Sequence, residues 1–144
     1  QALIRSNRLT TLTNELVGAL HLTRSEAIKR NHRVTLCKSA NGAQCASGAQ
    51  GYEQGWIVFD DPNNNATVDS GETIIRVFAA APAGMTLTGN TNVAHYISYT
   101  ATGTSHLVSN AFQAGTLTVC LTPEARDIVI NSVGRVRTEP APDC

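Results

Sequence analysis

Three features that often reveal a function are missing from this 144-residue sequence: a long apolar run, a strong net charge and a catalytic motif. A helix needs about 20 consecutive apolar residues to cross a bilayer, and no such run occurs, so the sequence contains no transmembrane segment. Lysine and arginine together number 11, as do aspartate and glutamate, which excludes the bulk basic character that strong nucleic-acid binding requires. The length fits a single domain.

Enzymatic activity finds no support in the sequence. The Gly-x-Ser-x-Gly elbow, the phosphate-binding loop and the His-Glu-x-x-His motif are all absent. Four histidines are scattered through the chain and share no motif: His21, His32, His95 and His106. We therefore expect a protein without catalytic residues and without a cofactor.

Aromatic residues are few, at 5%, whereas Thr, Asn, Ala, Ser and Gly are frequent, which favours a β-rich fold with polar loops. Cysteine occurs four times, at Cys37, Cys45, Cys120 and Cys144. A zinc site is disfavoured because the C-x-x-C spacing is absent and no histidine lies near a cysteine at ligand spacing. We expect disulfides, for which three pairings are possible. Cys37–Cys45 would close a short loop, and Cys120–Cys144 would then tie the last residue to a strand.

Residues 1–31 are predicted to form one long amphipathic helix, and no later segment resembles a second one. Its apolar face repeats at spacings of three and four residues: Leu9, Leu12, Leu16, Ala19, Leu20, Thr23 and Ala27. The helix should end near Asn31, where β-branched alternation begins. It starts at Gln1 without a clear capping residue, so we expect it to be the remnant of a longer helix.

The remainder of the chain alternates apolar and polar residues, which is typical of strands. We predict strands at residues 33–37, 56–59, 73–79, 85–88, 94–100, 117–121, 127–132 and 135–138, and a loop with a short strand within 104–116. One helix followed by seven or eight strands is an α+β arrangement. The apolar helix stripe should lie on the sheet, since isolated helices are only marginally stable.

Charge is unevenly distributed although the total is zero. Residues 1–38 carry seven bases and two acids, and residues 53–72 carry five acids and no base. This asymmetry orients the domain or a partner, or else both segments form solvated faces.

The acidic segment includes a partial match to the twelve-residue calcium loop. Asp61, Asn63, Asn65, Asp69 and Glu72 occupy positions one, three, five, nine and twelve of that pattern. Position six should be glycine and is Ala66, and the predicted flanks are strands rather than helices. The loop is therefore a weak calcium candidate, and the alternative is a solvated hairpin loop rich in turn-forming residues.

Near the end of the chain, Gly134 precedes two arginines that are two residues apart. In an extended segment Arg135 and Arg137 project to the same side. Two neighbouring guanidinium groups can bind phosphates or carboxylates. The alternative is a solvated strand edge, on which charged side chains prevent pairing between molecules.

Three stretches together carry a family resemblance. They are residues 24–28 (Arg-Ser-Glu-Ala-Ile), residues 55–60 (Gly-Trp-Ile-Val-Phe-Asp) and residues 134–137 (Gly-Arg-Val-Arg). With the segments between them, they resemble the GspH/FimT/FimU family of type IV minor pilins and type II secretion pseudopilins, in particular its FimT-like members. The resemblance spans nearly the whole chain, and it departs from the helix signature at Thr23, where alanine is usual.

The resemblance implies a pilin-like α+β fold in which one long N-terminal helix packs on antiparallel β-sheets. Residues 1–144 would form a single pilin domain, with 1–31 as the C-terminal half of the pilin helix and 32–144 as the β-rich part. The membrane-anchoring N-terminal segment of the family is not part of this sequence. The family is non-enzymatic, and its subunits stand in the bacterial inner membrane with the domain in the periplasm before they join an extracellular filament.

The same resemblance implies partners and a site. The N-terminal helix would contact other pilin subunits, and the missing N-terminal segment would insert into the inner membrane. FimT-type members are associated with DNA uptake in natural transformation (competence), and the double-stranded DNA contact would fall on Gly134, Arg135 and Arg137. One alternative is a structural GspH-type pseudopilin of a type II secretion system that does not bind DNA, and another is a calcium-stabilised adhesion module.

Overall fold

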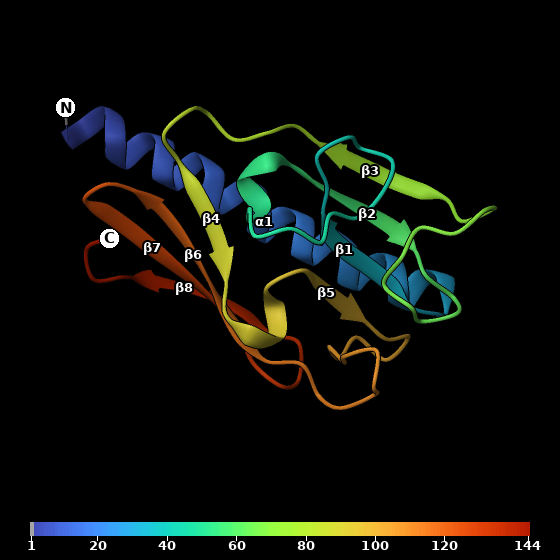
Figure 1. Ribbon diagram of the computed structural model, residues 1–144. Helices are drawn as coiled ribbons and strands as arrows, with labels where there is room; N and C mark the ends of the chain where they lie inside the picture. Colours follow the sequence, from blue (N-terminus) through green and yellow to red (C-terminus); the bar gives the residue numbers. More distant parts are fainter. Residues whose placement is uncertain (1) are drawn as a thin grey trace.

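The computed structural model describes residues 2–144 and places one long helix along two antiparallel sheets (Figure 1). The helix α1 spans Ala2–Arg30. An N-terminal sheet has the strand order β3-β2-β1-β5 and a C-terminal sheet the order β4-β6-β7-β8. This is the predicted α+β fold of the pilin type. Within residues 2–144 no helix is both long and apolar enough to cross a membrane.

Eight strands follow the helix. Those of the N-terminal sheet are β1 (Val34–Lys38), β2 (Trp56–Asp60), β3 (Ile74–Phe78) and β5 (Tyr96–Tyr99). Those of the C-terminal sheet are β4 (Thr86–Gly89), β6 (Gly115–Leu121), β7 (Glu124–Ile130) and β8 (Val136–Pro140). Two short 3-10 helices, η1 (Tyr52–Gln54) and η2 (Thr91–Val93), lie in the connections.

The predicted apolar face of α1 is confirmed residue by residue. Each of its seven members is at most 4% exposed: Leu9, Leu12, Leu16, Ala19, Leu20, Thr23 and Ala27. The helix ends where the sequence predicts, because Asn31 adopts a left-handed conformation (φ 61°) and its N–H donates to the Ala27 carbonyl at 2.9 Å. Asparagine tolerates this conformation better than most residues, so it ends helices well.

Strand predictions agree with the structure except in one region. The pairs β6–β7 and β7–β8 are antiparallel neighbours in sequence order, as hairpin connections require. Residues 104–116, for which a loop and a short strand were predicted, instead form two isolated bridges, Tyr99–Ser105 and His106–Phe112, before β6 begins at Gly115. These bridges place the segment along the outer side of β5.

The core has two parts of unequal size. The larger part lies between α1 and the inner faces of both sheets, and its largest fully buried side chains include Trp56, Tyr52 and Tyr99. A smaller cluster of Cys37, Ile57 and Phe59 lies on the opposite face of the N-terminal sheet, where loop residues Cys45 and Val68 cover it. The N-terminal sheet is therefore packed on both faces.

The edge of the C-terminal sheet at β4 is occupied by a side chain. Glu53 of η1 accepts the N–H of Leu87 at 2.9 Å with one carboxylate oxygen and the N–H of Gly51 at 3.0 Å with the other. A carboxylate thus takes a position on β4 that a neighbouring strand would take in a longer sheet.

Candidate functional site at the C-terminal edge

Strand β8 is an edge strand of the C-terminal sheet, and it carries the predicted arginine pair at its start. Its register sets Val136 opposite Ile130 and Arg137 opposite Val129. Val136 packs against the core, while both arginines are exposed. Because successive side chains of an extended segment alternate, Arg135 and Arg137 project away from the core on the same side.

The turn before β8 holds the arginines in a fixed place. The Arg135 N–H donates to the Asn131 side-chain oxygen at 3.0 Å, and the Asn131 N–H donates to the Arg135 carbonyl at 3.0 Å. Gly134 has a φ of +84°, and a Cβ built on it would lie 2.8 Å from the Gly103 carbonyl oxygen. Only glycine fits this turn without strain.

Tyr99 links this turn to the N-terminal sheet. Its hydroxyl donates to the Gly134 carbonyl at 2.9 Å, and its side chain is buried. Burial raises the pKa of Tyr99 to about 12. The hydroxyl therefore remains a donor throughout the physiological pH range, and the turn stays attached to β5.

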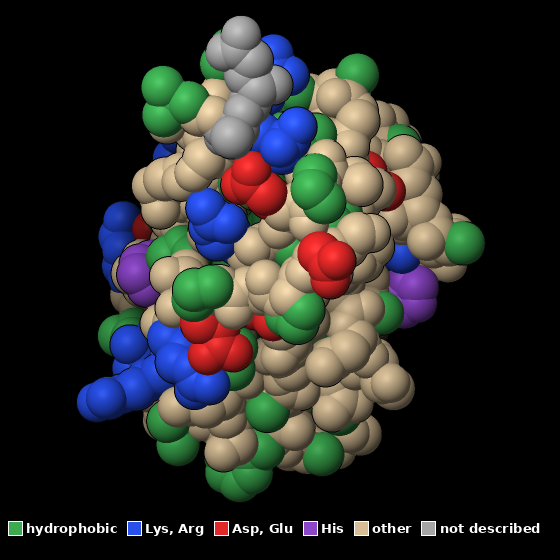
Figure 2. All heavy atoms as spheres, turned by 90° about the vertical axis from the view of Figure 1, so that its left-hand side faces the viewer, with side chains coloured by type: hydrophobic (Ala, Val, Ile, Leu, Met, Phe, Trp, Pro, Cys, Tyr) green, Lys and Arg blue, Asp and Glu red, His purple; other side chains and the backbone are tan. Residues whose placement is uncertain are grey.

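Acidic side chains lie close to the arginine pair. Arg137 forms an ion pair with Glu139 at 3.4 Å, with both side chains largely exposed. The register also sets Glu139 beside Asp127 of β7. Arg135 has no carboxylate within 4.0 Å among residues 2–144. On the face of the molecule shown in Figure 2, Lys and Arg side chains likewise lie close to Asp and Glu side chains.

Both disulfides that the sequence suggested are present. Cys37 pairs with Cys45, with Cα atoms 5.6 Å apart, and Cys120 pairs with Cys144, with Cα atoms 6.2 Å apart. The second disulfide ties the end of the chain to β6. The Cys144 N–H also donates to the Pro123 carbonyl at 3.2 Å, so the tail that follows the arginine strand runs back along the β6–β7 turn.

The calcium candidates at residues 61–72 are engaged mainly with one another and with the protein. Asp61 is fully buried, and its carboxylate accepts bonds from Thr35 and from two loop N–H groups. Asn63 and Asn65 each donate to Asp69, at 2.7 and 2.6 Å, which lowers the pKa of that carboxyl. Within residues 2–144 no three His, Cys, Asp or Glu side chains gather as they do around a metal.

Two details of this loop bear further on the calcium hypothesis. Ala66, at the position where glycine was expected, does take the left-handed conformation of the pattern (φ 55°). The Glu72 carboxylate accepts the Asp69 N–H at 2.9 Å. In this structure the loop carboxylates accept hydrogen bonds from other groups of the loop. The calcium site stays a prediction.

A polar network centred on Arg33 was not predicted from the sequence. This side chain is 9% exposed and donates to Ser98, Asn110 and two carbonyls at 2.7 to 3.4 Å, and also to Asn64. Burial lowers its pKa, and the nearby Asp61 carboxylate opposes that change. Arg33 thereby joins the loop that follows β2 to the segment that follows β5. No local pattern marks such a residue, because its partners are distant in sequence.

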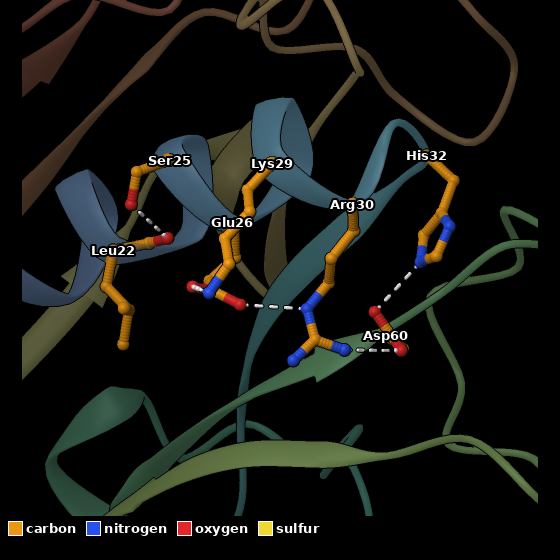
Figure 3. A network of polar contacts seen from close by, with 7 residues as sticks. All are labelled: Leu22, Ser25, Glu26, Lys29, Arg30, His32 and Asp60. Atoms are coloured by element: carbon orange, nitrogen blue, oxygen red, sulfur yellow. Dashed lines mark hydrogen bonds and ion pairs between the residues drawn. The ribbon is translucent and has the colours of Figure 1, made fainter.

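The two charged blocks of the sequence meet in the structure. Arg30, at the end of α1, bonds to both Glu26 and Asp60 at 2.8 Å, and Asp60 also contacts His32 at 2.9 Å (Figure 3). Arg30 at the helix end therefore neutralises Asp60, the one acid of β2. From the sequence, the uneven charge was expected either to orient the domain or a partner or to form solvated faces. Neither explanation applies to Arg30, Glu26 and Asp60, which pair with one another within the domain.

The start of α1 offers an apolar surface. Leu3 and Ile4 are 73% and 51% exposed. A groove of about 580 Å³ lies between this part of the helix and β3, with Ile4, Leu12 and Phe78 among its lining residues. Apolar surface exposed in this way is typical of a contact with another protein.

Comparisons with known proteins agree on the architecture. The model of the family described as "Type II transport protein GspH" matches residues 12–134. The type IV minor pilin FimU of Pseudomonas aeruginosa (strain PAO1) superposes with a TM-score of 0.69 at 21% identity, covering 94% of this chain and 90% of that chain. The minor pseudopilin EpsH from the type 2 secretion system of Vibrio cholerae superposes with a TM-score of 0.60 at 10% identity, covering 92% and 97%. A comparison with curated proteins finds no match.

Proposed function

This chain belongs to the GspH family of structural, non-enzymatic minor pilins and pseudopilins, and we propose that it is a FimT-like minor pilin of a type IV pilus that binds DNA through Gly134, Arg135 and Arg137. In this role it takes part in filament assembly or priming and in DNA uptake for natural transformation. It is anchored in the inner membrane with its domain in the periplasm before assembly, and it is extracellular in the pilus.

One observation carries the DNA proposal: two arginines project from one side of an exposed edge strand whose turn is fixed by hydrogen bonds. Guanidinium groups bind phosphate oxygens through paired N–H donors, and an edge strand presents them without obstruction. The ion pair between Arg137 and Glu139 reduces the local charge, so we expect weak binding that depends strongly on salt.

A gel shift with double-stranded DNA at low salt tests the site. We expect the Arg135→Gln/Arg137→Gln variant to bind at least about tenfold more weakly than wild type, and its log affinity to fall less steeply with log salt by about 1 per arginine. Arg76→Gln is the matched control, because Arg76 is an exposed arginine on β3, the edge strand of the other sheet. Equal binding by wild type and the double variant would falsify the assigned site.

Assembly with other pilin subunits through the helix is the second part of the proposal. The exposed Leu3 and Ile4 and the groove beside β3 support it, since they are apolar surface at the start of α1. Cross-linking from a cysteine placed at Ile4 in pilus-bearing cells should give adducts with other subunits. A cysteine at Gly48, an exposed loop residue, should give few.

The alternative is a structural pseudopilin of a type II secretion system without DNA binding. The acids near the arginine pair favour it, because Glu139 and Asp127 repel a polyanion. If wild-type protein produces no DNA shift at low salt, and deletion of its gene impairs secretion rather than piliation, this alternative replaces the pilus assignment.

A further inference from the structure

A polar slot of about 230 Å³ lies between α1 and strands β7 and β8, on the core side of the edge strand. Its lining residues include Thr10, Thr13 and Asn14 of the helix, Arg126 of β7, and Thr138 of β8. Nearly all of these side chains can donate a hydrogen bond. The slot is separate from the arginine pair, which projects from the opposite side of β8.

Thr13 is the first unusual residue of this slot. Thr13 is only 5% exposed, and its hydroxyl has no hydrogen-bond partner among residues 2–144. Other helix threonines satisfy theirs: Thr11 donates to the Asn7 carbonyl and Thr23 to the Ala19 carbonyl. A buried hydroxyl without a partner is destabilising, and such groups are rare in native proteins.

Arg126 is the second unusual residue. It is half-buried and donates only to the Ala125 carbonyl at 3.1 Å and to the Ser6 hydroxyl at 3.3 Å. No carboxylate lies within 4.0 Å of it in the part of the chain that the structure describes. Nearby, Arg5 does have such a partner in Glu124, at 3.3 Å. A guanidinium has five N–H donors and is seldom buried without an anion.

We propose that this slot binds a carboxylate, supplied by an acidic side chain of a neighbouring pilin subunit. Both oxygens of a carboxylate can accept from the Arg126 guanidinium, and the buried Thr13 hydroxyl can donate to one of them after its side chain rotates toward the slot. One base matches one negative charge. Glu124 lies two residues from Arg126, and its negative charge disfavours a polyanion such as nucleic acid.

The two halves of this proposal rest on different ground. The carboxylate chemistry follows from the slot alone, whereas the source of the carboxylate rests on the assembly role proposed above. A carboxylate that arrives on a docked subunit has a high effective concentration, so a site that binds free carboxylates weakly still suffices. The experiment therefore has one arm for the chemistry and one for the source.

The first arm titrates isotope-labelled protein with sodium acetate at constant ionic strength, with sodium chloride as background, and follows amide NMR shifts around Thr13 and Arg126. We expect saturable shifts that Arg126→Gln weakens by about tenfold or more, while Arg8→Gln, which changes an arginine of α1 that lines no part of this slot, leaves them unchanged. Thr13→Val should also weaken acetate binding, yet its melting temperature should equal or exceed that of wild type.

Three results of this arm would overturn the chemistry. They are acetate shifts that do not saturate, equal acetate affinity in wild type and Arg126→Gln, and a lower melting temperature for Thr13→Val, which would mean that the hydroxyl already has a partner. Tighter binding of inorganic phosphate than of acetate would replace the carboxylate by a phosphate ligand.

The second arm expresses the full-length protein in pilus-bearing cells and measures its amount in sheared filaments. We expect Arg126→Gln to lower incorporation several-fold, whereas Lys29→Gln, which changes an exposed base that lines neither this slot nor the groove beside β3, should leave it nearly unchanged. Normal incorporation of a variant that has lost acetate binding would overturn the subunit as the source. Absence of wild-type protein from all filaments would defeat the proposed function and, with acetate binding intact, leave the slot chemistry standing.

Discussion

The two sheets have four antiparallel strands each, yet they differ in how they are covered. All five residues of β1 and four of the five of β2 are buried, because α1 covers one face and loops cover the other. In the C-terminal sheet, β6 and β7 alternate between buried and half-exposed residues, because only the side toward α1 is packed. The N-terminal sheet is thus interior on both faces and the C-terminal sheet on one.

This difference separates the region that stabilises the fold from the region that carries the proposed DNA site. The outer cover of the N-terminal sheet contains the Cys37–Cys45 disulfide and the hydrogen bonds of Arg33, so this half is the rigid support. The open side of the C-terminal sheet presents Arg135 and Arg137, which make few contacts. Substitutions should therefore be costly to stability in the first region and nearly neutral in the second.

The largest effect is expected for Arg33→Met. The substitution removes five hydrogen-bonding contacts of a buried guanidinium and leaves the buried Asp61 carboxylate without the nearby positive charge. We expect a loss of about 3–5 kcal/mol in the free energy of unfolding. Urea denaturation of this variant and of Arg135→Met, with an expected change within about 0.5 kcal/mol, measures the contrast between the two sheets. A loss below about 1 kcal/mol for Arg33→Met would mean that the hydrogen bonds of Arg33 contribute little to the stability of the fold.

Gly134→Ala should have the next largest effect, although it lies in the more tolerant region. The added Cβ meets the Gly103 carbonyl oxygen and the Tyr99 ring, each at 2.8 Å, at a residue with φ +84°. We expect a loss of about 2 kcal/mol, measured by thermal and urea unfolding. Gly48→Ala is the matched control, since nothing lies within 4 Å of its added Cβ. Equal stability of the two variants would mean that the turn shifts freely.

Tyr99→Phe removes the hydrogen bond that joins the N-terminal sheet to the arginine turn. At neutral pH we expect a loss of about 1 kcal/mol. The folded-state pKa of Tyr99 is raised from 10.0 to about 12 by burial, so its stabilising contribution is complete below pH 10 and declines as pH rises toward 12. Stability measured from pH 9 to 12 should therefore fall more steeply in wild type than in Tyr99→Phe. Burial also raises the pKa of Tyr52, which is present in both proteins. Parallel curves for the two proteins would contradict the assignment.

The smallest effect is expected for the Arg135→Gln/Arg137→Gln variant. Among residues 2–144, Arg135 and Arg137 form one ion pair, between Arg137 and Glu139, whose side chains are 65% and 45% exposed. Exposed pairs contribute little, so the free energy of unfolding should stay within about 0.5 kcal/mol of wild type. Calorimetric melting checks this and shows that any loss of DNA binding is not caused by unfolding. A larger loss in the free energy of unfolding would mean that the two arginines stabilise the fold and do not lie on a free surface.

Local patterns in the sequence predict the helix and most strands well. The apolar spacing of α1 identifies all seven of its buried face residues, and Asn31 marks its end, because both depend only on neighbours along the helix. The exposure of Arg135 and Arg137 likewise follows from alternation around Val136. These predictions succeed because the residue spacing within one helix or strand determines which of its side chains are buried.

Long-range contacts are what the sequence does not reveal. Asp61 is a predicted calcium ligand in a polar loop, yet it is fully buried and its carboxylate accepts hydrogen bonds from Thr35 and from two loop N–H groups. The roles of Arg126 and Thr13 depend on how α1 crosses β7 and β8, and no local spacing encodes that crossing. For residues 104–116 the sequence predicts a loop with a short strand, and it does not reveal the two isolated bridges, because partners such as Ser105 cannot be identified from the segment alone.

The carboxylate of Glu53 has a consequence for the behaviour of the protein at high concentration. A subunit gathered at one place in a membrane or filament risks joining its copies by strand addition, which ends in amorphous or amyloid-like aggregates. Because Glu53 already holds the Leu87 N–H, a second chain that approaches β4 meets an occupied donor and a negative charge. Glu53→Gln keeps the shape but removes the charge, so we expect this variant to aggregate more readily along this edge than wild type does.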